Sequence, residues 1–229
     1  MIPRTAKPEG PGVSHPHRAY IPAAGRDFLL PFYDPLNRLL GIGRLHDELI
    51  AEARLEPGHR VLDVGCGTGS LAVRIRSRYP QVEVVGLDPD SKALAIARRK
   101  AEQAGVVVRF EQGYGDTLPF GNAVFERVTS SLMLHHLDLA TRRGMLRELL
   151  RVLRPSGSLH LLDFGRSEEQ SNGFLWRLFH SAEDLRENSD SRVAAILTEA
   201  GFEGVDRLGA RRTLFGRVAF HRGRKPAAE

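Results

Sequence analysis

The sequence predicts an α/β protein of the Rossmann-like type, with a mostly parallel sheet and helices on both faces. Strand-like apolar segments alternate with amphipathic helical segments over much of the chain, an order typical of parallel strands joined by crossover helices. A glycine-rich turn follows the first strand-like segment. The chain has 229 residues, of which 41% are hydrophobic, enough for one domain with a sizeable core.

The N-terminal region precedes this alternating pattern. Residues 1–19 contain four prolines and no apolar periodicity, and we predict that they form a disordered tail. Residues 20–229 then form a single domain that opens with an N-terminal helical cap over residues 20–56. The cap is predicted from leucines at helical spacing, namely Leu36, Leu39, Leu40, Leu45 and Leu49.

The predicted core, residues 57–165, begins where the sequence EPGH (56–59) interrupts the helical pattern. Helices are expected over Ser70–Tyr79, Ser91–Ala104 and Leu139–Leu153, the last ended by the sequence RPSG. The strands expected between them carry the sequences RVLDVG, VEVVGLD, VVVRFEQG, AVFERVTSSL and SLHLLDFG.

The C-terminal part departs from this alternation. Residues 166–190 are predicted to be an insertion that covers a substrate, and residues 191–229 a helix followed by a strand hairpin. The two last strands, within FEGVDRLGA and TLFGRVAFHRG, are separated by too few residues for a crossover helix. One strand of the sheet should therefore be antiparallel.

Composition limits the environment and the partners. The formal charge is +5 and the isoelectric point about 9.8, but basic and acidic residues are interspersed, which favours a solvated basic surface over a nucleic-acid partner. Peripheral contact with an anionic membrane is the alternative. The single cysteine excludes an internal disulfide and indicates a reducing compartment. With no secretory signal or membrane span apparent, we expect a cytoplasmic protein.

The stretch VLDVGCGTGSLA (61–72) carries the clearest ligand signal. Its glycines allow a tight turn and a close approach of ligand to backbone, but such a turn is weakly specific. In nicotinamide and flavin dinucleotide sites two residues separate the last two glycines, and here Ser70 stands at the final glycine position. A dinucleotide-dependent oxidoreductase is therefore a rival hypothesis that this turn disfavours.

Two carboxylates at strand ends indicate the charge of the ligand. Asp63 would repel a pyrophosphate but attract a sulfonium or an ammonium group, so it favours a cationic nucleoside such as S-adenosylmethionine (SAM). Asp88 follows the turn by about twenty residues, the position of a carboxylate that binds ribose hydroxyls in either type of site. Capping of a helix or turn is the alternative role of both.

These motifs resemble those of class I SAM-dependent methyltransferases, in the small-molecule branch that includes quinone-biosynthesis C-methyltransferases and bacterial phospholipid N-methyltransferases. The resemblance covers roughly residues 36–165 and rests on four segments: VLDVGCGTGSLA, VVGLDPDSKALAIAR, LPFGNAVFERVTSSLMLHHL and LRELLRVLRPSGSLHLLDFG. It implies a seven-stranded sheet with an antiparallel last strand, SAM as cofactor, and methyl transfer to a small-molecule or lipid-like acceptor. A SAM-binding regulatory protein without catalysis is the alternative.

The resemblance also implies which residues bind the cofactor. Relatives often have an Asp after the third strand that contacts the adenine amino group, where this chain has Tyr114. Adenine is therefore expected to meet Tyr114 by stacking or through its hydroxyl, with the Gly115 backbone or Asp116 supplying polar contacts. The full set of expected cofactor contacts is Asp63, Gly65, Cys66, Gly67, Thr68, Gly69, Asp88, Pro89, Tyr114, Gly115, Asp116 and Ser131.

Catalysis of methyl transfer depends mainly on positioning the two reactants, and a base is optional. His136 and Asp163 are the candidates for that base, although Asp163 could instead cap the segment after its strand. No metal site is predicted, because the adjacent histidines of LHHL (134–137) point apart on a helix and lack matching carboxylates.

The acceptor is expected to bind between two segments that mix bulky apolar residues with arginine, 26–41 and 172–188. The candidate lining residues are Tyr33, Phe174, Trp176 and Phe179. Core packing is the alternative role of each aromatic. A nucleic-acid acceptor is not expected, because the strand end reads SSLM instead of the [DN]PP[YF] signature of amino-methylating enzymes. The sequence leaves the oligomeric state open.

Overall fold

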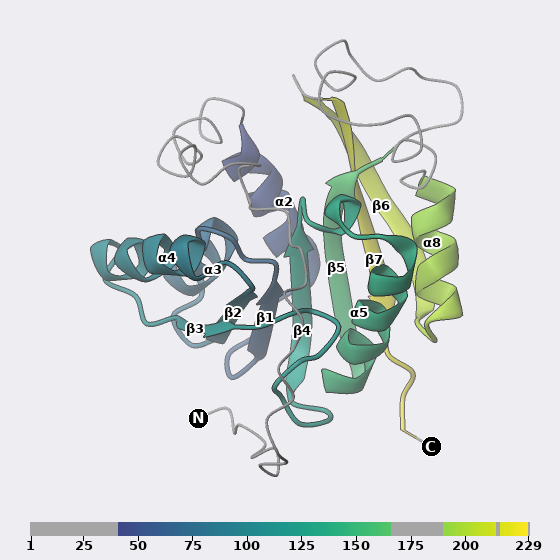
Figure 1. Cartoon of the computed structure of the whole chain (residues 1–229), viewed down its shortest axis with the longest axis horizontal. Helices are drawn as coiled ribbons and strands as arrows, with labels where there is room; N and C mark the ends of the chain where they lie inside the picture. The colour runs from purple at the N-terminus through teal and green to yellow at the C-terminus, as the bar shows by residue number, and fades with distance from the viewer. Residues whose placement is uncertain (1–40, 166–189, 214–215, 229) are drawn as a thin grey trace.

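The computed structural model describes residues 41–165, 190–213 and 216–228 of the chain. Seven strands form one sheet in the order β3-β2-β1-β4-β5-β7-β6 (Figure 1). The strands are β1 (Arg60–Val64), β2 (Glu83–Asp88), β3 (Arg109–Gln112), β4 (Phe125–Ser131), β5 (Leu153–Phe164), β6 (Glu203–Thr213) and β7 (Gly216–Arg224).

The sheet has the topology predicted from the sequence. Strands β1 to β5 pair in parallel, whereas β7 lies antiparallel to both β5 and β6. Because β1 lies between β2 and β4, the strand order reverses at β1. Ligands of doubly wound sheets bind at such a reversal point.

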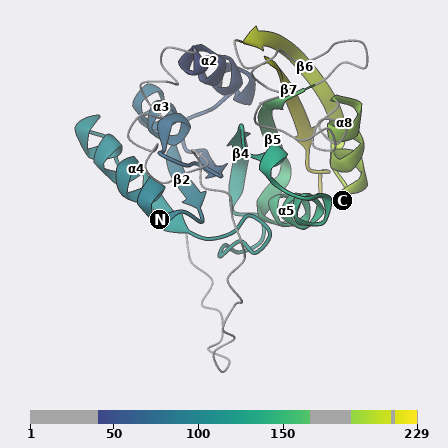
Figure 2. The same ribbon diagram turned by 45° about the horizontal axis from the view of Figure 1, so that its top comes forward.

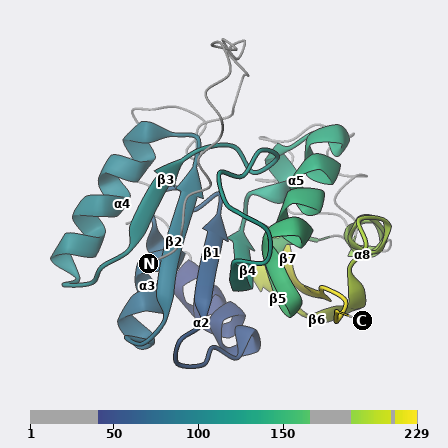
Figure 3. The same cartoon turned by 90° about the horizontal axis from the view of Figure 1, so that it is seen from below.

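Helices cover both faces of the sheet, as Figures 2 and 3 show. The described helices are α2 (Ile42–Ala53), α3 (Ser70–Arg78), α4 (Ser91–Gln103), the 3₁₀ helix η2 (Leu134–His136), α5 (Leu139–Val152) and α8 (Asp190–Glu199). Side chains of α2, α3 and α4 share one hydrophobic cluster with Val61 and Val84, while α5 and α8 share another with Leu62 and Val85. This alternation follows from the two-residue period of a strand, which sends neighbouring side chains to opposite faces.

Helix α4 shows how the local sequence sets these boundaries. Asp90 caps its first turn, because Oδ1 accepts hydrogen bonds from the amides of Lys92 and Ala93 at 2.8 and 3.2 Å. Gly105 follows the helix with a φ of 65°, a left-handed conformation that glycine adopts without strain. The helix predicted over Ser91–Ala104 is thus observed one residue shorter at its end.

The break predicted at RPSG differs in detail from the structure. Helix α5 ends at Val152, and β5 begins at once with Leu153, so the RPSG segment belongs to the strand. The register between β4 and β5 shifts between Phe125 and Arg127, and Ser156 has a φ of 62°. The helix thus ends just before RPSG as expected, and the RPSG segment itself forms an irregular start of β5.

Several predictions fall outside the described residues. These are the tail (1–19), residues 20–40 of the cap and residues 166–189 of the insertion, together with the acceptor-lining candidates Tyr33, Phe174, Trp176 and Phe179. Within the described part of the cap, Leu45 and Leu49 are buried on the apolar face of α2 as predicted. None of the helices described here is both long enough and apolar enough to span a bilayer.

Candidate cofactor and acceptor site

The glycine-rich turn connects β1 to α3 at the point where the strand order reverses. Its three glycines, within residues 65–69, have φ values of 69°, 51° and 74°, in the left-handed region that disfavours other residues. A Cβ on Gly65 would lie 2.4 Å from Cγ of Met133, so the turn packs closely against the chain that follows β4. The amides of Gly65 and Cys66 donate to the Leu87 carbonyl at 2.8 and 3.1 Å, which holds the turn against the end of β2.

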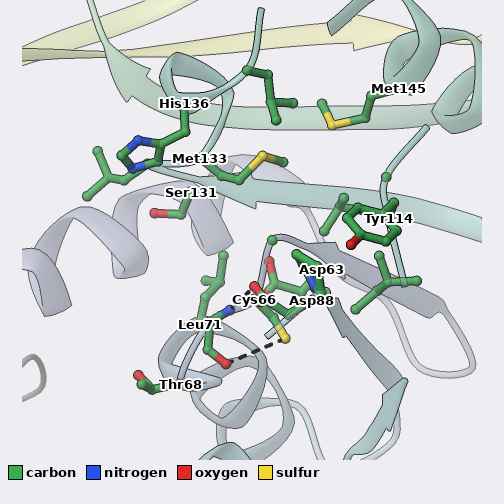
Figure 4. Close-up of a pocket in the computed structure, with 18 of the residues that line it drawn as sticks. Asp63, Cys66, Thr68, Leu71, Asp88, Tyr114, Ser131, Met133, His136 and Met145 are labelled. Atoms are coloured by element: carbon green, nitrogen blue, oxygen red, sulfur yellow. Dashed lines mark hydrogen bonds between the residues drawn. The ribbon is translucent and has the colours of Figure 1, made fainter. Parts of the chain in front are cut away.

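A cavity of about 530 Å³ lies against this turn (Figure 4). That volume is within the range of small-molecule sites. Twelve of the predicted cofactor-binding and catalytic residues line it: Asp63, Gly65, Cys66, Gly67, Thr68, Asp88, Pro89, Tyr114, Gly115, Asp116, Ser131 and His136. The other two, Gly69 and Asp163, do not.

Asp63, at the end of β1, is buried yet incompletely hydrogen-bonded. Its Oδ1 accepts a hydrogen bond from the Thr129 hydroxyl at 2.9 Å, and its Oδ2 has no hydrogen-bond partner among the described residues. Burial raises the pKa of Asp63 to about 7, the Thr129 hydrogen bond and a weaker interaction with the Ala72 backbone amide oppose that rise, and the nearby Asp88 carboxylate adds to it. A buried carboxylate oxygen without a partner is costly unless a ligand supplies a donor or a positive charge.

Asp88, at the end of β2, is held in place by backbone amides. Its Oδ2 accepts from the Gly67 amide at 2.8 Å and its Oδ1 from the Asp90 amide at 2.9 Å. Burial raises the pKa of the Asp88 carboxyl, while the two amide hydrogen bonds act in the opposite direction. Each oxygen keeps a second lone pair, so the oriented carboxylate can accept from two adjacent hydroxyls of a ribose.

The loop after β3 forms another wall of the cavity. Tyr114 is 36% exposed, and Figure 4 shows its ring at the edge of the cavity near Asp88. A Cβ on Gly115 would lie 2.9 Å from Cγ of Met145, so this loop packs tightly against α5. Tyr114, Gly115 and Asp116 all line the cavity, so each of them can reach a bound adenine. Which of them contacts the adenine stays a prediction.

His46 of α2 is a cavity residue that the sequence reasoning missed. Its Nε2 lies 3.1 Å from Oγ of Ser131, at the end of β4. Burial lowers the pKa of His46 to about 4, and the charge of Arg74 adds to this effect, so the imidazole is neutral near pH 7. A sequence signal exists, because His46 falls among the buried positions of α2, a stripe otherwise apolar.

His135, His136 and Asp163 form a connected group beside the cavity. The Asp163 Oδ1 lies 2.6 Å from Nδ1 of His135, and its Oδ2 accepts from the His135 amide at 3.2 Å. The rings of His135 and His136 lie 3.9 Å apart, and only His136 lines the cavity. Although burial opposes ionisation, the charge and hydrogen bond of His135 hold the pKa of Asp163 below its ordinary value.

Two of the expected residues, Gly69 and Asp163, lie next to the cavity lining without being part of it. The Asp163 carboxylate is buried, is engaged by His135 and accepts from the Phe164 amide at 2.7 Å, so its role as a base stays a prediction beside that of capping the segment after its strand. Gly69 packs on α4 instead, where a Cβ would lie 2.7 Å from Cβ of Ala97. A glycine at position 69 lets this turn pack closely against α4, and a local sequence motif does not reveal that contact.

Apolar side chains complete the cavity walls. They come from α2, α3, the ends of β1 and β2, the segment after β4 and α5, and comprise Ile42, Val64, Leu71, Leu87, Leu132, Met133, Leu137 and Met145. These positions were not predicted, because each belongs to an ordinary apolar pattern of its own element. No group of three His, Cys, Asp or Glu side chains suited to a metal ion occurs in the part of the chain that the structure describes.

The donor and acceptor set of this cavity fits SAM. The free Oδ2 of Asp63 offers an acceptor to an α-ammonium group, Asp88 can bind a ribose, and the bare glycine backbone admits close contact. A dinucleotide would instead bring its pyrophosphate towards the buried Asp63 carboxylate, which is unfavourable. Fold and site together define a nucleoside-binding α/β protein whose ligand carries a positive charge.

Comparisons with known proteins identify the family. The Methyltransferase domain family matches residues 61–157. Demethylmenaquinone methyltransferase of Thermus thermophilus is 38% identical over 154 residues, covering 66% of this chain and 69% of that protein. The ubiquinone/menaquinone biosynthesis C-methyltransferase UbiE of Ectopseudomonas mendocina is 31% identical, covering 85% and 84%. The chain belongs to the class I SAM-dependent methyltransferase family.

Solved structures support the fold but not the chemistry. The YcgJ protein from Bacillus subtilis superposes with a TM-score of 0.66 at 21% identity, covering 80% of this chain and 98% of that one. The [4+2]-cyclase SpnF gives the same TM-score at 22% identity, covering 81% of each chain. Since a cyclase shares this fold, the activity is inferred from the sequence relatives and the site. The protein is a SAM-dependent methyltransferase that acts on a small molecule.

Proposed function

We propose that this enzyme methylates a ring carbon of an aromatic quinol that carries an apolar tail, as its relatives named demethylmenaquinone methyltransferase indicate by their names. The observation that carries the proposal is the 38% identity to one of these proteins. The cavity is compatible with such an acceptor, because apolar side chains lie beside a small number of polar groups.

The proposed reaction joins a ring carbon to a methyl group. When bound, SAM supplies an electrophilic methyl group on a sulfonium, whose neutral thioether leaves. Partial deprotonation of a quinol hydroxyl makes the adjacent ring carbon more nucleophilic, and loss of the ring proton after transfer restores the aromatic ring. Two proton acceptors, or one used twice, are therefore needed near the acceptor.

We assign the His46–Ser131 pair to the quinol hydroxyl. The imidazole of His46 is neutral near pH 7, so it can accept a hydrogen bond through its unprotonated nitrogen. Ser131 fixes the ring at 3.1 Å and is itself part of the cavity wall. The pair would hold the hydroxyl near the site of methyl transfer.

We assign removal of the ring proton to His136. Its imidazole is exposed at the cavity, so it can pass a proton on to solvent. Asp163 does not contact the acceptor in this proposal. It orients His135, and the ring of His136 packs against His135. Asp163 is thus a positioning residue in this proposal.

The test is a methyl-transfer assay with labelled SAM and a demethylated, short-tailed menaquinol, with product mapped by mass spectrometry. The expected product carries the new methyl on a ring carbon, and His136→Asn should lower kcat about 100-fold with little change in KM. Asp163→Asn should lower kcat less and shift its pH profile, which a purely structural residue would not do. A product methylated on oxygen or nitrogen would refute the proposed reaction.

A lipid-like acceptor also bears on membrane contact. We propose that the basic protein meets anionic membranes peripherally, since a quinol with an apolar tail partitions into lipid and the formal charge is +5. Sedimentation with vesicles of anionic or neutral phospholipid tests this. Equal binding to both kinds of vesicle would contradict the proposal.

A further inference from the structure

A second cavity, of about 440 Å³, lies towards the amino-terminal ends of the parallel strands, whereas the cofactor turns follow their carboxyl ends. Arg127 and Ser158 lie near the starts of β4 and β5, whereas the cofactor site is formed after the ends of the parallel strands. The C-terminal end of α2, residues 52–54, closes one side of this cavity. We name it the basic cavity; its charged lining residues are Glu52, Arg54, Arg127, Glu203, Arg222, Arg224 and Lys225.

Strand register explains why these charges meet. Arg127 of β4 pairs with Ser158 of β5, which pairs in turn with Arg224 of β7. Two residues further along β5, and so on the same face, His160 pairs with Arg222 of β7. Side chains in register on neighbouring strands point to the same face of a sheet. Three guanidinium groups are thereby gathered around His160.

The neighbouring carboxylates neutralise only part of this positive charge. Five cationic side chains line the basic cavity against two carboxylates. The Arg127 guanidinium donates to the carbonyl oxygens of Ala53 and Glu126, at 2.8 and 2.9 Å, and it feels the charges of Glu56 and Glu126, although the Glu126 carboxylate pairs directly with Arg154. Arg222 pairs with Asp206. The lining of the basic cavity therefore keeps an excess of positive charge.

Two buried side-chain nitrogens in the basic cavity have no hydrogen-bond partner in the described part of the chain. His160 is 1% exposed; its Nε2 lies 2.9 Å from the Ser158 hydroxyl, and its Nδ1 has no hydrogen-bond partner among the described residues. When the Ser158 hydroxyl donates to Nε2, the ring proton lies on Nδ1 and is available to an acceptor. Nε of Arg222 is likewise buried without a partner in the described chain. A buried donor without an acceptor destabilises the fold unless a ligand accepts a hydrogen bond from it.

We propose that the basic cavity is a binding site for a phosphate-type oxyanion, separate from the cofactor and acceptor site. Arg222, Arg224 and Arg127 supply charge and forked donors that match phosphate geometry, and His160 supplies a neutral donor. The burial that lowers the pKa of His160 to about 3, with the charges of Arg127, Arg222 and Arg224 adding to it, keeps the ring uncharged. The phosphate can belong to a soluble metabolite or to a phospholipid headgroup.

Calorimetric titration of the full chain with inorganic phosphate and pyrophosphate, at constant ionic strength and with saturating S-adenosylhomocysteine, tests the proposal. Saturable binding is expected, weakened about tenfold by Arg224→Gln, since a hydrogen bond to a charged group is lost. Arg99→Gln is the matched control, because Arg99 is an exposed arginine of α4 away from the basic cavity. Absence of binding, or equal affinity in both variants, would overturn the proposal.

Two further measurements identify the position and source of the anion. Long-range ¹H–¹⁵N spectra should show the ring nitrogens of His160, assigned with His160→Gln, shifting on addition of pyrophosphate; no shift would contradict its role. Vesicles containing phosphatidylglycerol provide the second arm. Competition between vesicles and pyrophosphate would assign the site to a lipid headgroup, whereas pyrophosphate binding unaffected by vesicles would assign it to a soluble phosphate.

Discussion

The cofactor cavity lies at the carboxyl ends of the parallel strands and the basic cavity lies towards their amino-terminal ends. The two cavities differ in the sign of their buried charge. A row of polar side chains joins them across four adjacent strands, through Asp63, Thr129, His160 and Arg222. At the cofactor end a carboxylate oxygen lacks a partner, and at the other end two nitrogens do. Asp90, Ser130 and His221 also have a buried side-chain atom without a hydrogen-bond partner among the described residues, so an unpartnered atom supports a ligand site only together with the cavity that its residue lines.

Loss of the ribose carboxylate should give the largest effect and should separate the two cavities. Asp88→Ala is expected to weaken SAM binding about 100-fold, because two hydroxyl contacts to a charged group are lost. Arg224→Gln should leave SAM affinity within about twofold, since it lies at the other edge of the sheet. Calorimetry on both variants measures this difference, and comparable losses would show that the cavities are not independent.

Asp63 should stabilise the complex while destabilising the ligand-free protein. Its pKa of about 7 in the native state exceeds the ordinary 3.8, so the native state binds its proton more tightly than the unfolded chain. The contribution of Asp63 to the free energy of unfolding is therefore fully present below about pH 4 and is lost as the pH rises through about 7. Asp63→Asn, neutral throughout, should raise the free energy of unfolding of the ligand-free protein at pH 8 by roughly 2 kcal/mol. A decrease in urea unfolding experiments would contradict this account.

A pair of glycine variants tests how closely the cofactor turn is packed. Gly65→Ala places a Cβ 2.4 Å from Cγ of Met133 at a φ of 69°, whereas Gly58→Ala places one in open space at a φ of 85°. Both incur about 1 kcal/mol of backbone strain, and only Gly65→Ala adds a clash, for a total of roughly 2 to 3 kcal/mol. Thermal unfolding should rank them in that order, and equal losses would indicate that Met133 moves aside freely.

Low pH should reduce the free energy of unfolding, because each cavity contains one buried histidine that resists protonation. Burial lowers the pKa of His46 to about 4 and that of His160 to about 3, against 6.5 for an ordinary histidine. The unfolded chain therefore takes up protons that the native state does not, and stability falls as pH decreases from 6.5. His160→Asn should reduce the loss between pH 7 and pH 5 by about 2 kcal/mol. Parallel pH profiles for variant and wild type would refute this role of burial.

The sequence predicted the features that local patterns encode. The alternation of strands and helices, the C-terminal hairpin, the glycine turn and the carboxylates at the strand ends all depend on residues close together in the chain. Asp63 and Asp88 could be placed at one edge because parallel strands share their carboxyl ends. Strand boundaries were less accurate, as at RPSG, where cross-strand pairing extends β5 through a segment with loop composition.

Contacts between distant segments could not be predicted in this way. His46 meets Ser131 across 85 residues, and the packing of α2 that joins them has no local signature. The role of Gly69 against Ala97 and the pairing of Asp163 with His135 depend likewise on tertiary packing. The basic cavity was invisible for the same reason, because its arginines come together only through the register of β4, β5 and β7.

The recognition of a positive charge by Asp63 is tested most directly by comparing two ligands on two proteins. SAM carries the α-ammonium and the sulfonium, whereas 5′-methylthioadenosine keeps the nucleoside and lacks both charges. Calorimetry should show Asp63→Asn weakening SAM binding about 100-fold while changing methylthioadenosine binding less than about threefold. Equal changes for both ligands, or no loss of SAM affinity, would contradict the assignment of the unpaired Oδ2 to the cationic part of the cofactor.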